Sequence, residues 1–159
     1  MKQTIFMMAA GLLLAACGGG ESTDQGVTHT VDAGDGNSAT VRYGGGDDGI
    51  APPANLPDFA ALYPGAVIQS AVTGNEGEAK GMVTYYTPAK MAEVIEFYRA
   101  KGKAAGMTVA AEAAMGASRM LAMKRDGSND VGLQVTVAPP GEDDGRTMVS
   151  VVYDGGKPA

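Results

Sequence analysis

Residues 87–106, TPAKMAEVIEFYRAKGKAAG, decide the fold because they contain the clearest helix signal in the chain. Thr87 can cap the first turn, and Pro88 suits the first helical position, where its missing N–H leaves no hydrogen bond unmade. Gly106 is the residue type that most often ends a helix. Between these signals, apolar or small residues recur at the spacing of one side of an amphipathic helix. They are Met91, Val94, Ile95, Tyr98 and Gly102.

Segments on both sides of this helix alternate between apolar and polar residues, which is typical of strands. Two such segments precede the helix and four follow it, and most are separated by short turns. Short turns favour antiparallel neighbours, and one helix can cover one face of the resulting sheet. We therefore predict an α+β domain over residues 56–159, an antiparallel sheet with one long helix packed on one face, in the order ββαββββ. The predicted strands are residues 66–72, 79–86, 107–113, 118–124, 132–138 and 147–153.

Residues 17–55 differ in composition from the predicted domain. They contain ten glycines and six acidic residues, but Arg42 is their only Lys or Arg, and they have few apolar side chains. Such a segment buries too little surface to offset the entropy of an ordered chain. We therefore predict a flexible Gly/Asp-rich tether, although alternating residues within 27–43 leave a β-hairpin open. The acidic residues lack the spacing of a calcium-binding loop.

The first residues of the chain have the pattern of an export signal. Lys2 precedes an uncharged apolar run at residues 5–14, which is too short to span a bilayer and fits the hydrophobic core of a secretory signal. The sequence LAAC follows at residues 14–17, and Cys17 is the only cysteine in the chain. This arrangement resembles the lipobox of bacterial lipoproteins.

The resemblance implies that a signal peptidase cleaves between Ala16 and Cys17 and so removes residues 1–16 as a signal peptide. It also implies that the Cys17 thiol receives a diacylglyceryl group and that the new amino terminus carries a fatty acid such as palmitate. Several acyl chains make a lasting anchor, whereas one chain binds membranes only marginally. We therefore expect a lipid-anchored protein of the cell envelope that faces the periplasm or the exterior. Gly18, where an Asp tends to retain lipoproteins in the inner membrane, favours the outer membrane in a diderm host.

Five short motifs give the predicted domain a second resemblance. It is similar to small uncharacterised extracytoplasmic α+β domains that follow lipoprotein signals. They share a Leu-Pro-x-Phe and Tyr-Pro-Gly-Ala opening, a Thr-Pro helix start, a Phe-Tyr pair and a Gly-Met-Thr-Val exit. The resemblance implies the same fold, but these motifs are structural, and the group has no assigned activity. In this chain they are residues 56–59, 63–66, 87–88, 97–98 and 106–109.

Composition excludes several classes of function. A net charge of −6 argues against a nucleic-acid binder, which needs a cationic surface. A single cysteine excludes an internal disulfide and Cys-x-x-Cys sites. The predicted domain has neither His nor Cys, since His29 lies in the tether, so nucleophile–base pairs built on them are excluded. We predict no catalytic, cofactor-binding or metal-binding residues.

Three weaker candidate groups have structural interpretations. Carboxylates that could supply a glycosidase pair fit a solvated surface. Methionines that could hold Cu(I) fit core filling instead. A weak cationic patch around the helix also fits a solvated surface. The groups are Glu93, Glu96, Glu112 and Asp130; Met115, Met120 and Met123; and Lys90, Arg99, Lys101 and Lys103 with Lys124 and Arg125.

We therefore expect a non-enzymatic structural or interaction role in the cell envelope, with the lipid bilayer and an envelope protein as partners. The alternative is an extracytoplasmic module that binds a small ligand or Cu(I) between sheet and helix. An apolar pocket with inward polar groups would favour the alternative. A solid core with an exposed apolar patch would favour the interaction role.

Overall fold

The computed structural model describes residues 21–23, 26–34, 37–44, 46–75, 78–127, 131–141 and 145–155. The predicted signal peptide, the lipobox with Cys17 and the carboxylate Asp130 lie outside these residues. In the described part of the chain, no helix is long and apolar enough to cross a membrane.

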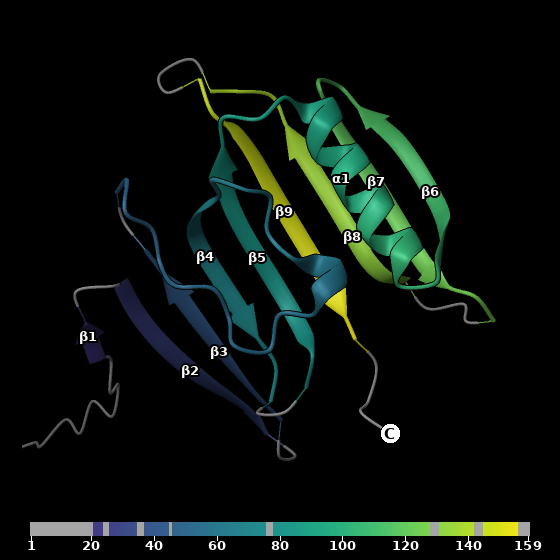
Figure 1. Cartoon of the computed structure of the whole chain (residues 1–159). Coiled ribbons are helices and arrows are strands. Elements are labelled where there is room, and N and C mark those ends of the chain that lie inside the picture. The colour runs from purple at the N-terminus through teal and green to yellow at the C-terminus, as the bar shows by residue number, and fades with distance from the viewer. Residues whose placement is uncertain are drawn as a thin grey trace, which may run out of the picture.

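The described chain forms one antiparallel sheet with a single α-helix across one face (Figure 1). The strand order across the sheet is β1-β2-β3-β4-β5-β9-β8-β7-β6. This arrangement confirms the predicted class, an antiparallel α+β fold with one helix on one face. The elements are β1 (Glu21–Thr23), β2 (Gly26–Gly34), β3 (Asn37–Tyr43), the short 3-10 helix η1 (Asp58–Ala60), β4 (Val67–Thr73), β5 (Lys80–Thr87), α1 (Met91–Ala104), β6 (Met107–Met115), β7 (Ser118–Arg125), β8 (Val131–Ala138) and β9 (Thr147–Asp154).

The six predicted strands are all present as β4 to β9, and their ends lie within two residues of the prediction. The predicted order ββαββββ is nevertheless incomplete. Among the described residues, β1, β2 and β3 also precede the helix, so that five strands come before α1 and four come after it.

A hairpin of β2 and β3 occupies much of the segment that the sequence predicts as a tether. Val27 lies opposite Tyr43, and the pairing continues to Gly34 opposite Asn37. β3 also pairs with β4, which joins the hairpin to the larger sheet. An isolated hairpin is marginal in water, whereas three or more strands over a hydrophobic face are stable. The structure therefore replaces the tether with sheet over residues 26–34 and 37–43.

The core lies between α1 and the strands beneath it. The helix turns Val94, Ile95 and Tyr98 inward, and each is at most 3% exposed. At Gly102 the helix approaches the sheet so closely that a Cβ atom would clash with the Met123 Sδ. The loop that carries η1 packs beside α1 and extends the covered part of this face (Figure 1).

The helix starts later than the sequence predicts. Thr87 is the last residue of β5 and is buried, and its Oγ1 accepts a hydrogen bond from the Ala89 backbone N–H at 3.3 Å. The helix begins at Met91, and the Lys90 backbone N–H donates to the Glu93 carboxylate at 3.1 Å. The threonine therefore closes a turn between strand and helix rather than capping α1. The predicted stop at the other end is confirmed, because Gly106 follows α1 with a φ of +74°.

Candidate interaction surface

The two faces of the sheet differ in what covers them. Side chains alternate along a strand, so Val83 and Tyr85 of β5 point to the side of α1 and are fully buried. Met82 and Thr84, which alternate with them, point to the opposite side. We call that side, which α1 does not cover, the open face.

Two rows of cross-strand neighbours run across the open face through six strands. Strand register places each residue opposite the next one in its row, and neither row contains a charged side chain. The first row is Val41, Val72, Met82, Val152, Gln134 and Ala122. The second row is Tyr43, Ser70, Thr84, Ser150, Thr136 and Met120.

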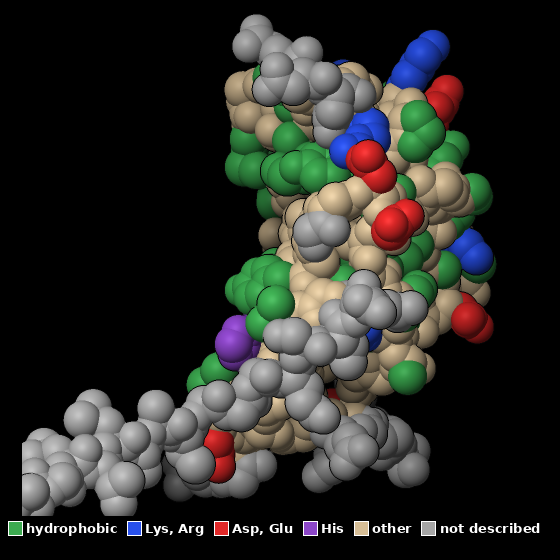
Figure 2. Space-filling view, turned by 90° about the vertical axis from the view of Figure 1, so that its left-hand side faces the viewer, with side chains coloured by type: hydrophobic (Ala, Val, Ile, Leu, Met, Phe, Trp, Pro, Cys, Tyr) green, Lys and Arg blue, Asp and Glu red, His purple; other side chains and the backbone are tan. Residues whose placement is uncertain are grey.

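Exposed apolar side chains concentrate on this face. Of the eight large hydrophobic residues that are exposed in the described chain, seven lie on the open face by register, and only Val109 points to the other side. Figure 2 shows hydrophobic side chains along the left-hand edge of the molecule, which is the side away from α1. Soluble monomers seldom expose a large contiguous apolar patch, and such patches mark contact sites. The seven residues are Val27, Val31, Tyr43, Met82, Met115, Met148 and Val152.

Charged groups lie at the two ends of the open face rather than in its middle. At one end, the Lys80 Nζ lies 3.6 Å from the Asp154 carboxylate. At the other end, the Arg146 guanidinium lies over the Tyr86 ring at 5.2 Å, and it contacts the Asp47 carboxylate at 3.4 Å. The centre of the open face is therefore uncharged, with apolar and hydroxyl side chains, and its rim is charged. Protein interfaces likewise are depleted of charged residues at the centre and have a polar rim.

The helix-covered face has a filled core instead. The hydroxyls of Tyr85 and Tyr98 share a hydrogen bond of 3.0 Å. Burial raises the pKa of Tyr85 to about 12 and that of Tyr98 still further, so both stay protonated near neutral pH. Burial also raises the pKa of Tyr153, whose hydroxyl has no hydrogen-bond partner in the described part of the chain. These hydroxyls are packed structural groups and are not accessible to a substrate.

A hollow of about 560 Å³ lies on the α1 side of the sheet but beyond the helix, between the β3–β4 end of the sheet and residues 53–55. Its lining is mixed polar and apolar, and some of its polar groups bind one another. The Asn75 Oδ1 accepts a hydrogen bond from the Ser38 backbone N–H at 2.7 Å, and Arg42 donates to the Ala51 carbonyl at 3.3 Å. The sequence-based alternative placed a ligand between sheet and helix, and this hollow lies elsewhere.

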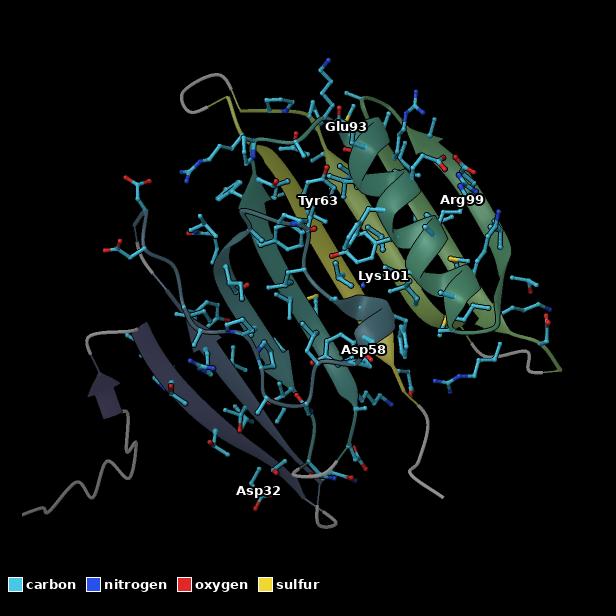
Figure 3. The ribbon with its side chains drawn as sticks, in the orientation of Figure 1. Asp32, Asp58, Tyr63, Glu93, Arg99 and Lys101 are labelled. Carbon is cyan, nitrogen blue, oxygen red and sulfur yellow. The ribbon has the colours of Figure 1, made fainter. Side chains whose placement is uncertain are left out.

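The structure places the candidate carboxylates in structural contacts. Arg99 of α1 binds Glu96 of the same helix at 3.1 Å. It also reaches toward β6 (Figure 3), where it binds Glu112 at 2.9 Å. The Glu112 hydrogen bond is the main cause of the raised pKa of Arg99. Glu93 binds the start of the helix through the Lys90 backbone. Each of these three carboxylates therefore has a cation or backbone partner.

The candidate cations and methionines do not form a binding cluster either. Lys101 lies over the Phe97 ring at 5.7 Å, and Arg125 lies over the Phe59 ring at the same distance. Met120 and Met115 are on the open face, whereas Met123 is buried on the side of α1. In the part of the chain that is described, no group of three or more His, Cys, Asp or Glu residues could hold a metal ion.

The open face is the feature that sequence reasoning missed, although its signal is visible in β5 and β9. Both strands carry apolar residues at consecutive positions, as in Met82-Val83 and Val151-Val152. A strand with one solvent-exposed face would alternate strictly between apolar and polar residues. The lack of strict alternation indicated a second apolar face.

The fold and this surface define a class of protein: a small α+β domain in which an antiparallel sheet carries a helix on one face and exposes an apolar surface on the other. The family model described as START domain-like matches residues 68–157, which is more than half of the chain. The chain therefore belongs to the START domain-like family. No curated protein and no solved structure matches it.

Proposed function

We propose that this protein is a lipid-anchored, non-enzymatic interaction protein of the bacterial cell envelope, and that its open face binds another protein. The exposed apolar residues of that face carry the proposal. The filled core on the opposite side supports it, as do the structural contacts of the carboxylates and cations around α1. These features match an interaction role better than a catalytic one.

The lipobox-like sequence at residues 14–17 supports the anchor. Cys17 precedes the start of the sheet, at Glu21 of β1, by four residues. A chain of that length reaches at most about 14 Å when fully extended. A lipid on Cys17 would therefore hold the sheet within a short distance of the bilayer, much closer than a tether over residues 17–55 would allow.

The anchor is tested by labelling cells that express the full chain with a fatty-acid analogue. We expect label in the wild-type chain and none in Cys17→Ser, because that variant lacks the thiol that would receive the lipid. Gly18→Ala is the matched control, since it changes the neighbouring residue and leaves Cys17 in place. Equal labelling of Cys17→Ser and the wild type would refute the anchor.

A small-ligand module is the second candidate, and the hollow beside β3 is the observation that favours it. START-like domains typically bind ligands, and Arg42 gives this hollow a positive charge. A ligand that binds only the native state raises the melting temperature. If small anionic compounds raise the melting temperature of the full chain but not that of Arg42→Ala, this candidate gains support. An equal rise in both proteins would exclude the hollow as their site.

A further inference from the structure

We propose that the partner of the open face is a second copy of this chain, so that two sheets pack face to face in a symmetric dimer. This inference rests on the proposed function because it names the partner of the same surface. Three properties of the open face carry it: its charge, its area and its geometry.

The charge distribution of the open face gives no preference for a basic or an acidic partner protein. Its two central rows contain no charged side chain, so neither a basic nor an acidic protein would gain from facing them. The Lys80–Asp154 pair places one cation and one anion together at the end of the face. A surface with a neutral centre and both signs at its rim is compatible with its own copy. A strongly charged surface would repel itself.

The area of the open face suits a stable dimer. Eight strands, from β2 to β6 in the sheet order, contribute to it. By register, β5 and β9 each place three uncharged residues on this face, Met82, Thr84 and Tyr86 on β5 and Met148, Ser150 and Val152 on β9. With strands about 4.8 Å apart and about 3.3 Å per residue, three such rows across the eight strands cover on the order of 700 Å². A stable protein interface buries about 800 Å² on each partner.

Sheet geometry also permits self-association. Two antiparallel sheets can pack about 10 Å apart with their strand directions roughly 30° from parallel. A two-fold axis then brings the same patch of each copy together, as in most homodimers. Met82 and Val152, which are direct cross-strand neighbours and are 36% and 42% exposed, would lie near the middle of the contact.

The test uses two full-length copies with different affinity tags, expressed together and solubilised from membranes. We expect one tag to co-isolate the other in the wild type. Val152→Lys should reduce this recovery at least ten-fold, because it places a charge in the apolar centre of both copies. Val109→Lys is the matched control and should leave recovery unchanged, since Val109 is 39% exposed but lies on the other side of the sheet.

Met82→Lys repeats the test from a different strand if Val152→Lys fails to fold, and thermal melts establish that each variant is folded. The inference is overturned if the wild-type copies do not co-isolate, or if a folded Val152→Lys or Met82→Lys protein still pairs. Mass spectrometry of the isolated material separates the two proposals. A different protein that is lost with Val152→Lys would leave the proposed function standing and end the dimer. If neither a second copy nor a different protein is isolated, both the dimer and the proposed interaction function are refuted.

Discussion

The two faces of this sheet are made of similar residues but have different environments. On the side of α1, Val83, Tyr85 and Val151 are completely buried. On the open face, the neighbouring Met82 and Val152 keep more than a third of their surface in water. Apolar composition alone therefore does not make a core; a second layer must cover it. The comparison indicates that the helix face stabilises the fold and that the open face is available for contact.

The largest loss of stability is expected when a methionine on the face covered by α1 is truncated. Met123 is fully buried, and its sulfur lies against Gly102 of α1. Met123→Ala should lower the free energy of unfolding by about 2–5 kcal/mol, because it removes buried apolar surface and leaves a cavity. Denaturant unfolding of the full chain measures this loss. A loss below about 1 kcal/mol would contradict a tightly packed interface between helix and sheet.

Alkaline pH should also lower the stability of the fold, through a tyrosine buried on the face covered by α1. In the folded state the pKa of Tyr85 is raised from 10.0 to about 12, mainly by burial. Its stabilising contribution is complete below pH 10, where the unfolded chain also keeps the proton, and it is lost as the pH rises from 10 through 12. The loss is on the order of 3 kcal/mol. Melting temperatures recorded between pH 9 and 12 should fall across this interval, and a constant value would refute the assignment.

A smaller effect is expected from the buried hydroxyls, and two tyrosines allow a matched comparison. Tyr85→Phe leaves the Tyr98 hydroxyl buried without its hydrogen-bond partner, which costs about 1–3 kcal/mol. Tyr153→Phe removes a buried hydroxyl that has no partner in the described chain, so stability should stay the same or rise slightly. Unfolding of both variants tests this order. If Tyr153→Phe were the more destabilising change, its hydroxyl would have a partner.

Most of the fold could be predicted because β4 to β9 and α1 each show their own periodicity. The start of α1 could not, because Thr87 and Pro88 have the residue types of a helix start but lie in a turn that Thr147 closes by donating to the Ala89 carbonyl. The hairpin was left open beside the tether for a different reason. β3 joins the sheet mainly through backbone pairing with β4, and its side chains, such as Thr40 and Val41, remain half-exposed.

The open face was harder to predict than the strands that form it. Alternation places Met82 and Tyr86 on one side of β5 and Val83 and Tyr85 on the other, and both sides are apolar. Which side the helix covers depends on long-range packing, such as the contact of Gly102 with β7. The carboxylates on α1 were correctly interpreted as surface residues, but the pairing of Arg99 with both Glu96 of α1 and Glu112 of β6 depends on the three-dimensional arrangement.

The smallest effect on stability is expected from the same residue type on the open face. Met82→Ala should cost less than about 1 kcal/mol, because Met82 is 36% exposed and no second layer is lost. If the open face mediates dimerisation, this cost should grow with protein concentration, since association stabilises only the native state. Met82→Ala would weaken that association, whereas the cost of Met123→Ala should depend less on concentration. Melting curves at two concentrations separate these cases. A large loss for Met82→Ala at every concentration would mean that the open face stabilises the single chain, as the helix face does.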